Sequence, residues 1–148
     1  MSKSTFAYVT FIRTTPERLW DALTAPEFMA QYWFGYYGES DWKPGSAWKL
    51  RDSKGHIASL GEVVEAAPPR RLVLRWRKPD AEDGDDSLCT FTIEPVPDNA
   101  TKTVKLSIVH SSERERSDLI EKVAGGWPRV LSNLKSFLET GEIILAAA

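Results

Sequence analysis

The hydrophobic pattern is most regular near the C-terminus, between Glu115 and Gly141. At about 100° per residue, the apolar side chains of this stretch fall within an arc of about 120° on a helical wheel, and polar residues lie opposite. The pattern predicts one long amphipathic helix, which ends at Gly141 because glycine adopts the left-handed conformation that closes a helix. The apolar stripe consists of Leu119, Ile120, Val123, Trp127, Val130, Leu131, Leu134, Phe137 and Leu138.

Gly125, Gly126 and Pro128 interrupt this helix in its middle. Pro128 removes one backbone hydrogen bond and crowds the preceding turn. The apolar stripe nevertheless keeps its phase on both sides of the interruption, which two independent helices would have no reason to do. We therefore predict a single helix that bends at Pro128, convex towards solvent.

The N-terminal part of the chain predicts a strand followed by two short helices. The segment Thr5 to Arg13 is rich in β-branched and aromatic residues and is largely apolar on both faces. Two similar helix-start signals follow, in which threonine precedes a proline in the first turn and a glutamate. The first signal begins with Thr14 as the predicted cap, and the second begins at Thr24.

The middle of the chain predicts consecutive strands. A turn-rich connection from Gly35 to Gly45 comes first, and short apolar segments separated by turns follow it. Because the connections are short, we expect neighbouring strands to be antiparallel. The predicted strands are Ser46–Arg51, His56–Ala66, Arg71–Lys78, Leu88–Glu94 and Thr103–His110.

These elements predict an α+β fold within a single domain that spans residues 1–148. A curved antiparallel sheet of about six strands would wrap around the long C-terminal helix, with the two short helices after the first strand. An antiparallel sheet with one apolar face needs a cover, and the long helix is the only predicted element of sufficient size. A strongly curved sheet around a helix leaves space between them, which is the physical reason to expect a ligand cavity.

Composition restricts the possible partners. The 148 residues carry a net charge of −2, so we expect no nucleic-acid partner. Cys89 is the only cysteine, which excludes an internal disulfide and a thiolate metal cage. No segment resembles a signal peptide or a membrane span. We therefore expect a cytoplasmic protein that binds no metal and no cofactor and is either a monomer or a homodimer.

Three segments carry a resemblance to a known family: Arg13–Trp20, Pro68–Leu72, and Gly126-Trp127-Pro128 with the leucines that follow it at positions 131, 134 and 138. They resemble the homologues of the activator of heat-shock protein 90 ATPase, specifically its C-terminal domain, within the START-like, birch-pollen-allergen-like SRPBCC superfamily. The similarity covers about Phe6 to Gly141. It implies a helix-grip fold with a hydrophobic cavity under the C-terminal helix.

The resemblance does not define one function, because the fold is shared by lipid carriers, cyclases and chaperone regulators. No catalytic residues carry over from the family. The full-length eukaryotic activators have a separate N-terminal domain that this sequence lacks, which weakens the expectation of a chaperone role.

We expect the cavity to be lined by aromatic and aliphatic side chains from the helix stripe and the inner faces of the strands. For each tryptophan, a purely structural place in the core is the alternative. We interpret Trp127 as a cavity wall rather than a filled core position, because neighbouring glycines leave space beside it. The candidate ligand-binding residues are Trp33, Trp48, Leu74, Trp76, Phe91, His110, Trp127 and Leu131.

Other reactive residues give weaker signals. His110 could face the cavity as a general acid or base, or could be a structural histidine at the end of a strand. His56 beside a glycine turn and Glu62 on a middle strand are expected in solvent, and Cys89 is expected to be an apolar filler. The acidic residues between Pro79 and Asp86 do not follow the order of a calcium loop. The arginines of the Arg71–Lys78 strand are expected on the outer face of the sheet.

The sequence therefore supports three functional hypotheses. The first is binding of a small hydrophobic molecule, aromatic or lipid-like, in the cavity. The second is a chaperone co-regulator that binds a protein partner through the surface of the sheet or helix. The third is a cyclase- or hydrolase-type enzyme that uses the same cavity. The first is preferred, because no nucleophile and base can be paired in the sequence.

Overall fold

A seven-stranded antiparallel sheet is the largest unit in the part of the chain that the computed structural model describes, namely residues 4–79, 86–97, 102–114 and 117–146. The strand order is β1-β7-β6-β5-β4-β3-β2. Among these neighbouring pairs, β1 with β7 is the one whose strands are distant in sequence. The strands are β1 (Ser4–Arg13), β2 (Tyr37–Ser40), β3 (Ala47–Arg51), β4 (Ile57–Ala67), β5 (Arg71–Arg77), β6 (Ser87–Pro95) and β7 (Thr103–Ser112). The predicted α+β class and the antiparallel order are confirmed.

Strand β2 was not expected, because the segment from Gly35 to Gly45 was predicted to be a turn-rich connection. Its four residues, Tyr37 to Ser40, pair with β3 at the edge of the sheet. Four residues are too few for apolar and polar positions to alternate recognisably, so hydrophobic periodicity gives no signal here.

Two short helices follow β1 as predicted: α1 (Pro16–Thr24) and α2 (Pro26–Tyr32). Their caps lie one residue later than predicted. Thr15, not Thr14, accepts the hydrogen bond from the backbone N–H of Arg18, at 3.2 Å. In each helix the proline takes the first helical position, so the residue directly before it is the cap. For α2 that residue is Ala25, which has no side-chain acceptor.

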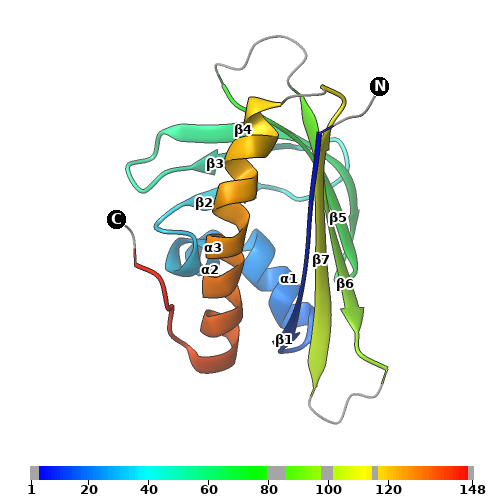
Figure 1. Ribbon diagram of the computed structural model, residues 1–148, viewed down its shortest axis with the longest axis vertical. Helices are drawn as coiled ribbons and strands as arrows, with labels where there is room; N and C mark the ends of the chain where they lie inside the picture. Colours follow the sequence, from blue (N-terminus) through cyan, green and yellow to red (C-terminus); the bar gives the residue numbers. More distant parts are fainter. Residues whose placement is uncertain (1–3, 80–85, 98–101, 115–116, 147–148) are drawn as a thin grey trace.

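The long helix α3 (Asp118–Thr140) is continuous through Pro128, which confirms the prediction of one helix. The helix begins at Asp118, three residues after the predicted start at Glu115. Ser117 caps it by accepting a hydrogen bond from the N–H of Ile120. Gly141 closes the helix with a φ of 84°, as predicted. In Figure 1, α3 runs along the concave side of the sheet, beside α1 and α2. The bend at Pro128 stays a prediction.

Helix α3 also covers the free edge of the outermost strand, β1. The ammonium group of Lys135 donates to the carbonyl oxygen of Phe11 at 2.7 Å, and the Glu139 carboxylate accepts from the N–H of Arg13 at 2.9 Å. Lys135 and Glu139 pair with each other at 2.6 Å. An open strand edge is a template for pairing with other chains, and these contacts block part of it.

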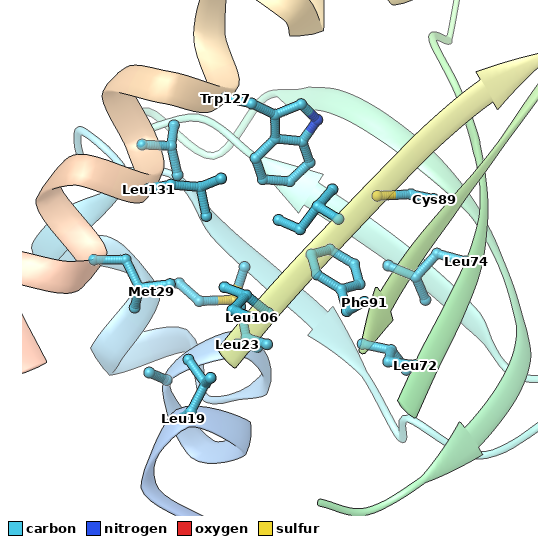
Figure 2. Close-up of a cluster of buried hydrophobic side chains, with 14 of the residues drawn as sticks. Leu19, Leu23, Met29, Leu72, Leu74, Cys89, Phe91, Leu106, Trp127 and Leu131 are labelled. Atoms are coloured by element: carbon cyan, nitrogen blue, oxygen red, sulfur yellow. The ribbon is translucent and has the colours of Figure 1, made fainter. Parts of the chain in front are cut away.

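The core lies between the inner face of the sheet, α3 and the two short helices (Figure 2). Side chains at alternate positions of β7, from Val104 to His110, are all buried, as the strand pattern predicts. Helix α3 contributes its stripe from Leu119 to Leu138. The core therefore fills the concave side of the sheet along most of α3.

Candidate functional site

The filling is incomplete where α3 passes over the ends of β3, β4 and β5. A pocket of about 320 Å³ opens there between the helix and the sheet. Trp33 and Tyr36, from the segment after α2, complete its wall. The lining residues are Trp33, Tyr36, Leu50, Ala58, Ser59, Trp76, Lys78, Leu119, Lys122, Val123, Gly126, Trp127 and Val130.

Three indole rings form one side of this pocket. The ring centroids of Trp33 and Trp127 lie 5.3 Å apart, and those of Trp76 and Trp127 lie 5.7 Å apart. Trp33 and Trp76 are stacked at 6.4 Å. These separations are typical of favourable aromatic pairs, so the three rings support one another as a rigid wall.

The space in front of this wall depends on a glycine of α3. A Cβ atom placed on Gly126 would have no atom within 4 Å outside its own helix. Lys122, Gly126 and Val130 are four residues apart and share one face of the helix, so a larger residue at position 126 would extend into the pocket. Gly126 therefore keeps the pocket open.

Behind the wall lies a buried hydrogen-bonded chain centred on His110. The Trp127 indole N–H donates to Nδ1 of His110 at 3.2 Å. Because an indole nitrogen is only a donor, Nδ1 must be the acceptor, and the imidazole proton is on Nε2. Nε2–H then donates to the Ser87 hydroxyl oxygen at 2.9 Å, and that hydroxyl donates to the backbone oxygen of Trp76 at 2.7 Å. Each polar side-chain atom of Trp127, His110 and Ser87 therefore has a hydrogen-bond partner.

Burial determines the charge state of this group. His110 has no exposed surface, and desolvation lowers the pKa of its imidazole from 6.5 to about 4. The ring is therefore neutral near pH 7, in agreement with the direction of its hydrogen bonds. Of the two interpretations offered by the sequence, the structural one describes His110: it is a core histidine whose two ring nitrogens both form hydrogen bonds.

The structure divides the eight residues predicted to line the cavity into three groups. Trp33, Trp76 and Trp127 line the pocket. Trp48, Leu74 and Phe91 instead line a separate space of about 20 Å³, to which Trp33 and Trp76 also contribute. His110 and Leu131 are buried but line neither space. Trp127 is only 3% exposed, so it is a core residue as well as a pocket wall.

Trp48 shows why the sequence alone misplaces a tryptophan. Its indole N–H crosses Gly61 and donates to the carbonyl oxygen of Arg75 at 2.9 Å. A Cβ on Gly61 would lie 1.7 Å from that oxygen, so the close approach requires glycine. The ring is thereby held against Trp76 rather than placed in the pocket.

Sequence reasoning missed the polar lining. Ser59 lies on an inward-facing position of β4, Tyr36 follows α2, and Lys78 and Lys122 carry positive charge. Lys122 could have been found, because it lies one helical turn before Gly126 and next to Val123 of the apolar stripe. Ser59 and Lys78 gave no signal, since their position depends on how the strands pair.

Most of the remaining reactive residues lie where the sequence predicts. The His56 side chain is 77% exposed, beside Asp52, and Glu62 pairs with Arg77 on the outer face of the sheet at 2.7 Å. Burial raises the pKa of the Cys89 thiol, which makes that thiol unreactive. The acidic segment at 80–85 lies outside the described residues.

Two further searches cover only the residues that the structure describes. They contain no group of three or more histidine, cysteine or acidic side chains that could hold a metal ion. None of the helices in this part of the chain combines the length and apolar character that a membrane crossing requires.

A curved antiparallel sheet around a long C-terminal helix, with a pocket between them, defines a helix-grip protein. Residues 13–139 match the family described as activator of Hsp90 ATPase homolog 1-like protein, and the chain belongs to this family. The resemblance found in the sequence is thus confirmed. A comparison with curated proteins gives no match.

Several solved structures share the fold. An Hsp90 activator from Plasmodium falciparum is 25% identical, with a TM-score of 0.73 over 90% of this chain and 95% of that one. The Aha1 dimer from Colwellia psychrerythraea is 20% identical, with a TM-score of 0.75 over 93% of this chain and 98% of that one. CalU16 from Micromonospora echinospora is 18% identical, with a TM-score of 0.73 over 94% of this chain and 78% of that one.

Proposed function

We propose that this protein binds a small hydrophobic molecule in the pocket between α3 and the sheet. The observation that carries the proposal is the open space at Gly126, in a pocket that is also lined by the indoles of Trp33, Trp76 and Trp127. Burying the apolar surface of a ligand against these rings would supply the free energy of binding. A volume of about 320 Å³ lies at the lower end of the range for small-molecule sites, which is roughly 300–1,000 Å³.

The hydrogen bonds around His110 favour a pocket that binds a ligand over one that hydrolyses a substrate. A serine nucleophile needs its proton accepted by a base, but here the Ser87 hydroxyl donates to the Trp76 carbonyl while His110 donates to Ser87. Neither side chain lines the pocket. The two residues therefore have the role of holding the pocket wall.

The test is a matched pair of variants on α3, Gly126→Leu and Gly125→Leu. Gly125 is exposed and does not line the pocket, and a Cβ on either glycine meets no atom within 4 Å outside the helix. Each replacement removes a glycine from a helix interior, which favours folding by about 0.5–1 kcal/mol. Both variants should therefore fold, and they differ in whether the leucine enters the pocket.

The readout is the fluorescence of the uncharged probe N-phenyl-1-naphthylamine. We expect saturable binding to the wild type and to Gly125→Leu, and binding to Gly126→Leu that is at least about tenfold weaker, because the leucine occupies the ligand volume. Equal binding by the two variants, or no binding by the wild type, would refute the proposal.

A protein partner is the second candidate, because the outer face of the sheet is apolar near β1. Val9 is 53% exposed and Phe11 51%, and Val109 on the adjacent strand β7 is 42% exposed. Exposed apolar surface of this kind is typical of interaction sites. The doubly substituted Val9→Thr/Phe11→Thr chain tests this candidate. Stimulation of the Hsp90 ATPase by the wild type that is lost in the double variant would support it, and no stimulation by the wild type would count against it.

A further inference from the structure

We propose that the ligand is an acid, with an apolar body inside the pocket and one anionic group held at its rim by Lys122. This inference rests on the proposed function and adds the chemical class of the ligand. Its basis is the polar part of the lining. The charged side chains there, among the described residues, are lysines, and hydroxyl groups add further hydrogen-bond donors.

The charged residues that line the pocket, within the described part of the chain, are two lysines. Lys122 projects from α3 one turn before Gly126, and Lys78 follows β5 two residues after Trp76. Lys122 forms no ion pair among the described residues, whereas Lys135 on the same helix is paired with Glu139. Lys122 is thus a cation at an apolar pocket with no counter-ion among the described residues, which is suited to a negatively charged ligand.

Two hydroxyl groups add to this set. Neither Ser59 nor Tyr36 forms a side-chain hydrogen bond within the described residues, although Ser59 is only 6% exposed. The Ser59 hydroxyl oxygen is not completely buried, so it is open to the pocket, where a group on a ligand is a natural partner for it. Together the ammonium and hydroxyl groups provide several donors, which matches the several acceptor lone pairs of a carboxylate or sulfonate.

The location of the charges also fits the energetics of an amphipathic acid. Lys122 is exposed, so an anion beside it keeps part of its hydration while the apolar body is buried. Complete burial of an ion pair would carry a large desolvation penalty, and a pair at the rim avoids it. The same geometry orients the ligand, with its charged end outward and its apolar end against Trp33, Trp76 and Trp127.

Two fluorescent probes that differ by one anionic group provide the test. N-phenyl-1-naphthylamine is uncharged, and 8-anilinonaphthalene-1-sulfonate has the same ring system with one sulfonate. The variant is Lys122→Gln, and its control is Lys49→Gln. Lys49 is exposed on β3, next to the pocket residue Leu50 but on the opposite face of the sheet. Both substitutions change the net charge equally.

We expect Lys122→Gln to bind the sulfonate probe about three to ten times more weakly than wild type, and the uncharged probe within about twofold of wild type. Lys49→Gln should resemble wild type with both probes. The preference should decrease in high salt, because the charges at the rim are screened. Gly126→Leu should lose both probes, which excludes binding of the sulfonate at the outer face.

Each alternative result has a separate meaning. If the wild type binds the uncharged probe but not the sulfonate, or if Lys122→Gln and Lys49→Gln affect the sulfonate equally, this inference is wrong and the proposed function stands. If neither probe binds the wild type, the proposed function fails and the inference fails with it.

Discussion

The indole N–H of Trp127 donates a hydrogen bond to Nδ1 of His110, with 3.2 Å between the two nitrogens. This contact joins the helix that forms one side of the pocket to the last strand of the sheet. Through Ser87, the same chain reaches the backbone of Trp76, which carries a second indole of the pocket wall. Two of the three wall indoles are therefore connected through one neutral histidine.

The first prediction concerns the dependence of stability on pH. The pKa of His110 is about 4 in the folded state and near 6.5 when the residue is exposed. Between these values the unfolded state binds a proton that the folded state does not, so stability decreases as the pH falls. We expect a loss of about 2 kcal/mol between pH 7 and pH 5 from this residue alone.

Chemical denaturation at a series of pH values measures this loss. Replacing His110 by phenylalanine removes the titrating group, so the variant should be less sensitive to pH in the same window, although less stable at pH 7. His56→Gln is the control, because that side chain is 77% exposed. Identical pH profiles for wild type and His110→Phe would show that His110 is not protonated on unfolding in this range.

The second prediction concerns Trp127. The sequence predicts Trp127 to be a cavity wall rather than a filled core position, but its burial and its contacts with Trp33, Trp76, Phe91 and His110 are those of a core residue. We therefore expect Trp127→Ala to lower the free energy of unfolding by about 3–5 kcal/mol and to weaken probe binding.

Trp127→Phe separates the hydrogen bond from the packing. It keeps an aromatic ring but leaves Nδ1 of His110 without a donor, which should cost about 1–3 kcal/mol. Denaturation curves of the two variants provide the comparison. A cost below about 1 kcal/mol for Trp127→Ala would mean that the ring borders empty space on most sides.

The third prediction concerns the segment after α3. The buried side-chain oxygen of Asn133 accepts from the backbone N–H groups of Ile144 and Leu145, at 3.1 and 2.8 Å. Its amide nitrogen donates to the carbonyl oxygens of Leu145 and Tyr32, at 2.8 and 3.3 Å. One side chain thus fixes the C-terminal segment against α3 and the end of α2.

Asn133→Ala should lower the free energy of unfolding by about 2–3 kcal/mol, since several buried backbone groups lose their partner. Hydrogen exchange at the amides of Ile144 and Leu145 should become faster, while exchange in β6 and β7 changes only with global stability. Ser132→Ala, which removes one hydrogen bond to the Pro128 carbonyl, is the neighbouring control. Unchanged protection of the two amides in Asn133→Ala would contradict this account.

The sequence was sufficient for the main elements because their signals are local. The phase of the stripe from Leu119 to Leu138 defines α3 even across Pro128, and the proline positions define α1 and α2 to within one residue. Strand β2 escaped because four residues at a sheet edge show no periodicity. The cap at Thr15 escaped because two adjacent threonines offer the same side chain, and only the position of Pro16 distinguishes them.

The site was predicted less completely, because it depends on contacts between distant segments. The inward direction of Trp76 and Trp127 follows from local periodicity. The separation of Trp48 from the pocket depends on Gly61, which lets its indole reach Arg75. The approach of Ser59 and Lys78 to Lys122 depends on the pairing of β4 with β5 and on the position of α3, and neither is encoded in a short stretch of sequence.

The most direct test of the central claim is a titration followed by NMR on ¹⁵N-labelled protein. The six tryptophans give separate indole N–H signals, which can be assigned with single Trp→Phe variants. On addition of N-phenyl-1-naphthylamine, we expect saturable shifts for Trp33, Trp76 and Trp127, because the ring of the probe would lie against these indoles. The signal of Trp20, which lies on α1 and outside the pocket lining, should remain in place. Saturable binding that moves Trp20 but leaves Trp33, Trp76 and Trp127 unchanged would contradict a ligand site between α3 and the sheet.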